Sequence, residues 1–463
     1  MLGRKKSKSH GLKIIIIGCG KVGNTLIEQL SQEGHDLTVI DQNPIKISEI
    51  TNAYDVMGLV GNGASYSVQK EAGIQSADLL IAVTGSDELN LLCCTIATQE
   101  SECSTIARVR TPDYSQETAY LQNKLGLTMI INPELEAARE TARILFLPSA
   151  LEVTSFAHGQ AELIKFKIPA GNMLCGMDIA TFGKHIPVNV LFCAVERGKN
   201  VFIPSGEFVF QEGDIISFVS TRKNARSFFK HIGVKSRNIR SAMIVGGGTA
   251  GFYLAQQLCN AGLDVKLIES KAARCETLSI LLPEATIIHG NAIDQGLLEE
   301  EGITETESFI PLTGIDEENI MLTLYAKHVS DAKVITRVTR IGFKDVIDSL
   351  NLGSVIYPKY ITSEAIIAYV RAKHASKDNS DIETLSYMFN GRAEAIEFLV
   401  KEESAVTNIP LCELPLKKNL LLTFISRNGK VIFPHGDDCI KVGDTVMVVT
   451  THAGFHNILD ILA

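Results

Sequence analysis

The stretch LKIIIIGCGKVGNTLIEQLSQEGHDLTVID, residues 12–41, decides the fold of this chain. It opens with Ile14–Ile17, a continuous β-branched run that is typical of a strand buried on both faces of a parallel sheet. A glycine-rich turn and a helical pattern follow, and a second apolar run, Leu37–Ile40, ends at Asp41. The order strand, turn, helix, strand predicts a βαβ unit.

The turn has the spacing G-x-G-x-x-G, formed by Gly18, Gly20 and Gly23. In nucleotide-binding βαβ units the first glycine permits the tight turn, the second lets the backbone approach a pyrophosphate, and the third lets helix and strand pack closely. Asp41 follows at the distance expected of a carboxylate that accepts hydrogen bonds from ribose hydroxyls and repels a 2′-phosphate. The pattern predicts a nucleotide site. The alternative is a turn kept for packing alone.

Composition limits the possible classes of protein. The chain has 463 residues, which favours several domains, and its hydrophobic content of 45% is ordinary for an α/β protein. No run approaches the roughly 18 apolar residues of a membrane-spanning helix, so we expect any membrane role to be peripheral or through a partner. The net charge of −9 argues against general nucleic-acid binding. Residues 1–11 read as a basic, flexible tail rather than a signal peptide.

The ten cysteines show no C-x-x-C pair and no metal-ligand spacing, and most lie inside apolar runs. We expect them to fill the core of a protein in a reducing compartment. The neighbouring Cys93 and Cys94 leave a redox pair open as an alternative.

Residues 12–150 alternate apolar runs with helical patterns, which predicts a doubly wound parallel sheet of six strands. From Phe156 to about His231 short alternating strands replace this pattern, and the expected strands are 161–168, 187–195, 201–203 and 215–219. This segment reads as a separate small α+β domain.

Both patterns then occur again. The turn and acid of the first half recur 228 residues later as Gly246, Gly248, Gly251 and Glu269, and farther along Asn62, Thr84 and Arg108 recur 229 residues later as Asn291, Thr313 and Arg337. The small domain recurs at an offset of 230, where Arg197, Gly213 and Asp214 become Arg427, Gly443 and Asp444. The chain is therefore a tandem duplication. The expected domains are a tail at 1–11, then 12–150, 151–236, 237–376 and 377–463.

With these residues the chain resembles the TrkA family of peripheral subunits of bacterial Trk potassium-uptake systems. Each half is similar to an RCK unit, which consists of a Rossmann-like domain (TrkA-N) and a small α+β domain (TrkA-C), and the resemblance extends from Leu12 to Ala463. It rests on the combination of G-N-x, T-G-x-D-E-x-N, the strand arginine and the G-D pair of each small domain. The resemblance therefore implies an α/β fold with two doubly wound sheets, each followed by a small domain.

The resemblance implies a regulator and not an enzyme. Such proteins bind NAD(H) or adenine nucleotides such as ATP and ADP, assemble into a homo-oligomeric ring of RCK domains, and gate a TrkH-like or TrkG-like potassium-transporting subunit from the cytoplasmic face of the membrane. Carried over position by position, the contacts fall on Gly18, Cys19, Gly20, Lys21, Val22, Gly23, Asp41, Gly61, Asn62, Thr84 and Arg108, and on Gly246, Gly248, Thr249, Gly251, Glu269, Asn291, Thr313 and Arg337.

Some positions depart from the family pattern. The third motif reads Gly61-Asn62-Gly63 where G-D-x is common, and the Asn132-Pro133 of the first half becomes Tyr357-Pro358 in the second. Glu269 is one methylene longer than Asp41, so the two sites need not share a ligand or an affinity.

Two other functions are compatible with the fold. An NAD-dependent oxidoreductase would need a second domain that presents an acid or base to the nicotinamide, and the sequence offers no H-E-x-x-H, nucleophile elbow or Walker lysine. A regulatory subunit of another cation transporter or antiporter would keep the same fold and change only the partner.

Overall fold

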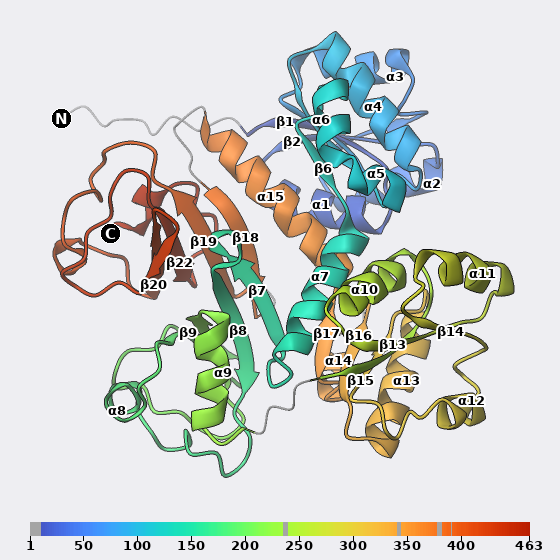
Figure 1. Cartoon of the computed structure of the whole chain (residues 1–463). Coiled ribbons are helices and arrows are strands. Elements are labelled where there is room, and N and C mark those ends of the chain that lie inside the picture. The colour runs from blue at the N-terminus through green and yellow to red at the C-terminus, as the bar shows by residue number, and fades with distance from the viewer. Residues whose placement is uncertain (1–10, 235–238, 340–343, 377–381, 390) are drawn as a thin grey trace, which may run out of the picture. The chain divides into compact units, whose positions relative to one another are not determined.

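The computed structural model describes residues 11–234, 239–339, 344–376, 382–389 and 391–463, and the basic tail that precedes residue 11 lies outside these ranges. Contacts between Cα atoms divide the chain into two compact units. One consists of the residues up to Glu134 together with Lys359–Ile367, and the other of Leu135–Pro358 with Ala368–Ala463. Figure 1 draws both units and labels many of their elements.

A parallel six-stranded sheet forms the first unit, with the strand order β3-β2-β1-β4-β5-β6. Its strands are β1 (Lys13–Ile17), β2 (Asp36–Asp41), β3 (Met57–Val60), β4 (Leu79–Ala82), β5 (Ser104–Arg108) and β6 (Met129–Ile131). The segments between them form α1 (Lys21–Gln32), α2 (Pro44–Ala53), α3 (Tyr66–Glu71), η1 (Ile74–Ser76), α4 (Asp87–Glu100), α5 (Pro112–Gln116) and α6 (Thr118–Leu125). The strand order reverses at β1, beside the glycine-rich turn.

The β-branched run at β1 is buried on both faces, as the sequence predicts. Ile15 and Ile17 pack in one core cluster with Cys93 and Cys94 of α4, all at most 2% exposed. Successive strand residues point to opposite faces of the sheet. Ile14 and Ile16 therefore point to the other face, where they are also buried. The two vicinal cysteines thus fill the core, and burial raises the pKa of Cys93 to about 12.

The second parallel sheet repeats the first with the order β14-β13-β12-β15-β16-β17. Its strands are β12 (Ser241–Val245), β13 (Asp264–Glu269), β14 (Thr286–His289), β15 (Ser308–Pro311), β16 (Lys333–Arg337) and β17 (Ser354–Ile356). Its helices are α10 (Thr249–Asn260), α11 (Ala272–Leu281), α12 (Gln295–Glu300), α13 (Asp316–Val329) and α14 (Lys344–Ser349). After each parallel sheet a helix leads along the chain into a small domain: α7 (Pro133–Phe146) and α15 (Pro358–Ser376).

Each small domain has a five-stranded antiparallel sheet, and the two sheets share one topology, β10-β9-β11-β8-β7 and β21-β20-β22-β19-β18. The first comprises β7 (Glu152–Phe156), β8 (Ala161–Lys167), β9 (Leu191–Arg197), β10 (Asn200–Phe202) and β11 (Ile215–Ser220), with η2 (Ala157–Gly159), α8 (Ile179–His185) and α9 (Arg222–His231). The second comprises β18 (Ile382–Met388), β19 (Ala393–Leu399), β20 (Leu420–Arg427), β21 (Lys430–Ile432) and β22 (Thr445–Thr450), with η3 (Leu411–Glu413) and η4 (Ile458–Ile461). The predicted fold class, two Rossmann-like sheets each followed by a small α+β domain, is confirmed.

Two strands of the first small domain differ from the prediction. The sequence pattern did not predict β7, which pairs with β8 through a tight turn. The strand predicted from Pro187 is β9, which begins at Leu191. The arginine and aspartate that recur near the end of each small domain form a two-point ion pair. Arg197 and Asp214 approach to 2.7 Å, as do Arg427 and Asp444, and both carboxylates are 1% exposed.

The two small domains of the chain share one hydrophobic core. Its members come from both sheets, and include Phe156 and Leu163 from the first and Phe389 and Phe424 from the second. Two of its members, Ala157 after β7 and Phe389 after β18, both adopt a left-handed backbone, with φ of 48° and 50°. The Ala157 N–H donates to the Glu397 carboxylate at 2.7 Å.

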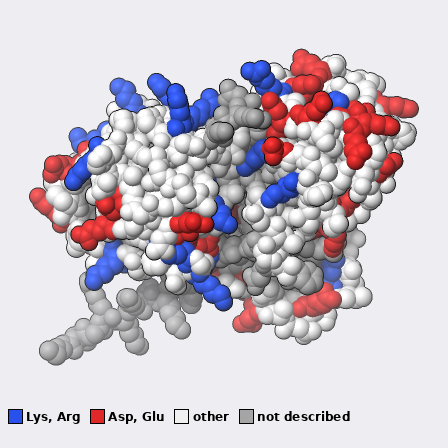
Figure 2. Space-filling view, turned by 90° about the horizontal axis from the view of Figure 1, so that it is seen from below, with Lys and Arg blue, Asp and Glu red and all other residues white. Residues whose placement is uncertain are grey.

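Within the ranges that the structure describes, none of the helices combines the length and the apolar sequence needed to cross a membrane. Basic and acidic side chains both occur on the face of the molecule seen in Figure 2.

Candidate nucleotide-binding sites

In both halves the predicted site residues gather at the carboxyl ends of the parallel strands. Gly18 follows β1 and donates its N–H to the Ile40 carbonyl of β2 at 2.9 Å, and Gly246 makes the equivalent bond to Ile268 at 2.8 Å. The glycine-rich turns therefore lie beside the point where each strand order reverses, which is where open α/β sheets bind ligands.

The three glycines of the first turn meet three different surroundings. Gly18 has φ +104°, and a Cβ there would lie 2.9 Å from the Thr84 nitrogen. A Cβ on Gly23 would lie 2.0 Å from the Gly18 carbonyl oxygen, so this glycine allows α1 to pack against the turn. Gly20 differs from both, because a Cβ there would meet nothing within 4 Å and its φ of −87° suits any residue. Protein packing explains Gly18 and Gly23 but leaves Gly20 unexplained.

The second turn repeats this arrangement. Gly246 has φ +106°, and a Cβ on Gly251 would lie 2.0 Å from the Gly246 carbonyl oxygen. A Cβ on Gly248 would meet nothing within 4 Å, and its φ is −64°. In both halves the middle glycine therefore borders open space.

Open space at the middle glycine coincides with the start of a helix. Gly20 is the N-cap of α1 and Gly248 is the N-cap of α10, and neither helix has a side-chain cap or an acidic residue in its first turn. The first N–H groups of a helix have no partner within the helix, and the helix dipole makes this end positive. An uncapped helix start next to open space is suited to an anion such as a pyrophosphate.

The other predicted residues of the two turns differ in exposure. Cys19 is 2% exposed, and burial raises its pKa to about 12, so its side chain serves the core. Val22 is buried, whereas Lys21 at the start of α1 is exposed. Thr249 occupies the equivalent first position of α10 and is partly exposed.

The acid at the end of the second strand holds the turn in each half. Asp41 accepts the Cys19 N–H at 2.8 Å and the Asn43 N–H at 2.9 Å. Glu269 accepts the Gly247 N–H at 2.9 Å and the Lys271 N–H at 2.8 Å. The longer glutamate thus reaches the same backbone positions as the aspartate, and both carboxylates stay beside the glycine-rich turn.

Gly61, Asn62 and Asn291 lie next to these acids at the ends of β3 and β14. Gly61 donates its N–H to the Asp41 carbonyl at 3.0 Å. The Asn62 side chain accepts the Ala64 N–H at 3.1 Å, and Asn291 accepts the Ile293 N–H at the same distance. Both asparagines therefore form Asx turns that shape the loop beside the acid.

Thr84 and Thr313 lie in the loops after β4 and β15. Thr84 donates its N–H to the side chain of Asn90 at 2.8 Å, and Asn90 donates to the Arg108 carbonyl at 2.9 Å. The second half repeats this bridge with Thr313, Asn319 and Arg337. In both halves one buried asparagine thus joins the ends of two neighbouring strands.

The aspartate of the T-G-x-D-E-x-N motif also has a structural role that the sequence pattern does not indicate. Asp87 is 3% exposed and accepts the backbone N–H groups of Arg110 and Thr111 and the Thr111 hydroxyl. Burial acts to raise its pKa, but the hydrogen bonds from Thr111 and Arg110 outweigh burial, so the pKa lies below its ordinary value. Asp316 accepts from Thr339 in the same way.

The two strand arginines point to different groups. The Arg108 guanidinium forms an ion pair with Glu134 at 2.8 Å, and both side chains are 16% exposed. Arg337 instead donates to the Thr313 carbonyl at 3.1 Å, beside the glycine-rich turn. The sequence repeat equates the two arginines, but Glu134, the partner of Arg108, has no equivalent acid in the second half, where Lys359 follows Tyr357-Pro358.

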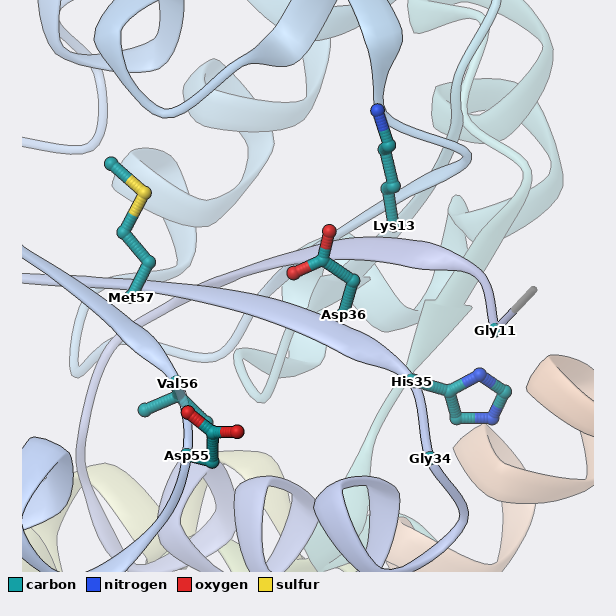
Figure 3. A pocket seen from close by; sticks show the side chains of 8 residues that line it. All are labelled: Gly11, Lys13, Gly34, His35, Asp36, Asp55, Val56 and Met57. Carbon is teal, nitrogen blue, oxygen red and sulfur yellow. The ribbon is translucent and has the colours of Figure 1, made fainter.

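A pocket lies at the amino-terminal ends of the strands of the first sheet, opposite the glycine-rich turn (Figure 3). Its lining includes Lys13, Asp36 and Met57, the first residues of β1, β2 and β3. Because parallel strands begin here, the pocket is remote from the glycine-rich turn and does not belong to the candidate nucleotide site.

Comparison with known proteins identifies both kinds of domain twice. The model of the TrkA-N domain matches residues 14–133 and 242–358, and that of the TrkA-C domain matches 163–233 and 395–463. The chain is 31% identical over 443 residues to the Trk system potassium uptake protein TrkA of Halomonas elongata, covering 94% of this chain and 95% of the relative. It is 30% identical to the TrkA of Haemophilus influenzae with the same coverage.

Solved structures with the same fold include the RCK domain of GsuK, with a TM-score of 0.63 over 96% of this chain and 93% of that chain. The GsuK channel bound to NAD gives a TM-score of 0.62 over 96% of this chain and 78% of that chain. Their sequence identities to this chain, 17% and 16%, establish a shared fold.

Proposed function

Because the chain belongs to the TrkA family, carrying a TrkA-N and a TrkA-C domain in each half, we propose that it is a nucleotide-sensing regulatory subunit that gates potassium transport through a membrane protein. The ligands we propose are NAD(H) and the adenine nucleotides ADP and ATP. The names of its relatives, potassium uptake proteins, and of a structural neighbour, a channel bound to NAD, support this assignment.

The single observation that carries nucleotide binding is the middle glycine of each turn. Gly20 and Gly248 have ordinary backbone angles and open space where a side chain would be, so packing does not require glycine at either position. A pyrophosphate that contacts the backbone would require it. In this proposal the uncapped starts of α1 and α10 hold the phosphates, and Asp41 and Glu269 bind the adenosine ribose.

The proposal treats the chain as a regulator and not as an enzyme. Polar groups that border the first turn are already used in structure, since Asn90 bridges two strands and Asp87 holds the loop after β5. The lowered pKa of Asp87 keeps its carboxylate ionised at neutral pH, so it is a poor proton donor. NAD(H) bound here would act as a signal and would not transfer hydride.

The partner we propose is a TrkH-like or TrkG-like membrane subunit, contacted from the cytoplasmic face by a ring of these chains. A nucleotide shifts such an assembly only if its affinity differs between the two arrangements. A tenfold difference supplies about 1.4 kcal/mol at each site. Several sites in one ring would add to a decisive shift of the gating equilibrium.

Substitution of the middle glycines tests the proposal. Gly20→Val places a branched side chain where the pyrophosphate would lie, and we expect it to weaken binding of ADP and NADH at the first site by at least about a hundredfold. Gly248→Val should do the same at the second site. Gly20→Ala and Gly248→Ala control for folding, because a Cβ has room at both positions.

Isothermal titration calorimetry measures the affinity of each variant. Potassium flux through the reconstituted membrane subunit should lose its nucleotide dependence in the variant that carries both valines. Undiminished nucleotide affinity in that variant, with its fold intact, would contradict the proposed sites.

A further inference from the structure

The two halves use the cation beside the ribose acid differently. Lys46, in the first turn of α2, and Arg274, in the first turn of α11, are equivalent at the offset of 228. In the first half Lys46 approaches the Asp41 carboxylate to 3.8 Å, and the lysine side chain is 45% exposed. This is a loose and solvated ion pair, which a ribose hydroxyl could displace at little cost.

Arg274 is held by the turn and not by the acid. Its Nε donates to the Gly247 carbonyl at 2.8 Å, and the Gly247 N–H donates to the Glu269 carboxylate at 2.9 Å. Over the described residues, Arg274 forms no ion pair within 4.0 Å, and its two terminal nitrogens make no hydrogen bond. One edge of the guanidinium is therefore anchored beside the ribose acid, and its terminal nitrogens remain available to a ligand.

The location of Arg274 determines which part of a bound nucleotide its side chain can contact. In the proposed binding mode the phosphates lie at the start of α10, and the adenosine lies beside Glu269, which shares Gly247 with Arg274. A planar guanidinium stacks on the face of an aromatic ring, which a lysine ammonium cannot match. A 2′-phosphate is the other group an arginine could bind here, but the Glu269 carboxylate beside it would repel that charge.

We propose that Arg274 stacks on the adenine and makes the second site selective for a purine base, while Lys46 leaves the first site less selective. This inference rests on the proposed function, because it assigns a specificity residue within the same candidate site.

Arg274 also braces the turn, and a test must separate the two roles. ADP and UDP carry the same ribose and the same diphosphate and differ only in the base, so a damaged turn would weaken both by the same factor. Loss of stacking would weaken ADP much more than UDP. The ratio of the two dissociation constants therefore reports base selectivity independently of the turn.

The experiment uses the full chain with one site blocked. In the Gly20→Val background only the second site binds, and there we expect Arg274→Lys to lower the preference for ADP over UDP by about tenfold. In the Gly248→Val background the matched variant Lys46→Arg should raise that preference at the first site by several-fold. Calorimetric titration with ADP, UDP, NADH and NADPH measures each constant.

Each other outcome overturns a defined statement. Equal weakening of ADP and UDP by Arg274→Lys would leave Arg274 as a brace only. Tighter binding of NADPH than NADH at the second site would assign Arg274 to a phosphate and overturn base stacking. If neither ADP nor NADH binds with Arg274 in place, the proposed function fails at the second site, and this inference fails with it.

Discussion

The first half of the chain begins β5 with Ser104, and the second half begins the equivalent strand β16 with Lys333. Equivalent elements also begin with different caps, since Ser86 caps α4 with its side chain whereas Ile315 precedes α13 without one. Against these differences the strand orders of the two parallel sheets are the same. The contacts common to both halves are therefore those that the fold requires, and the others can differ without changing the strand order.

The contacts that occur in both halves fix the positions of neighbouring backbone segments. Asn90 and Asn319 bridge the same two strand ends, and Gly23 and Gly251 allow the same close approach of helix and turn. The contacts that differ include those of two long side chains near the glycine-rich turns, Lys46 and Arg274. The duplicated fold therefore retains the contacts that shape each glycine-rich turn, whereas side chains near the proposed ligand differ between the halves.

At neutral pH the largest effect should come from a side chain that fills the close approach of helix and turn in either half. Gly23→Ala and Gly251→Ala each place a Cβ 2.0 Å from a carbonyl oxygen, and we expect each to cost about 3 kcal/mol of unfolding free energy. Denaturant titration of each variant measures this cost. Gly20→Ala is the control and should change stability by less than about 1 kcal/mol. If Gly23→Ala lowers the unfolding free energy and Gly251→Ala does not, the two glycines are not structurally equivalent.

Lys333 gives the second half a pH dependence that Ser104 cannot give the first. Its Nζ donates to the Ala150 carbonyl at 2.6 Å, and the described residues place no carboxylate within 4.0 Å of it. Burial, with a smaller effect from the charge of Lys327, lowers the pKa of Lys333 to about 7.

The folded chain therefore releases a proton that the unfolded chain keeps up to its ordinary lysine pKa. Between pH 7 and about 10 the unfolded state binds more protons, so this lysine makes stability rise with pH by about 1.4 kcal/mol per unit. Below pH 7 both states are protonated and its contribution is constant. The difference in unfolding free energy between the natural chain and Lys333→Met should show this slope. Lys223→Met, at an exposed lysine in α9, is the control, and a flat difference for Lys333→Met would contradict the assignment.

The smallest effect should come from exchanging the helix caps. Ser86 accepts the Leu89 N–H at 3.2 Å, so Ser86→Ala should destabilise the first parallel domain by about 1 kcal/mol. Ile315→Ser should stabilise the second by a similar amount, because α13 gains a cap that it lacks. Thermal unfolding of both variants measures the shifts, and a loss of stability in Ile315→Ser would show that the exposed isoleucine has another role.

The sequence predicted the duplication, both parallel sheets and the place of each glycine-rich turn, because these depend on local patterns that repeat at a fixed spacing. It did not predict that Arg108 pairs with Glu134 while Arg337 turns to the Thr313 carbonyl. Such choices depend on which groups meet in space. Likewise the shared core of the small domains joins Phe156 to Phe389, residues far apart along the chain, and no local pattern encodes their contact.

The central claim is that both halves bind adenine nucleotides through their glycine-rich turns. The most direct test is a calorimetric titration of the unmodified chain with ADP and with NADH, counting sites per chain. We predict two sites, one removed by Gly20→Val and the other by Gly248→Val. An absence of binding at millimolar ligand, or binding that survives both substitutions together, would contradict the claim and leave the turns with a packing role alone.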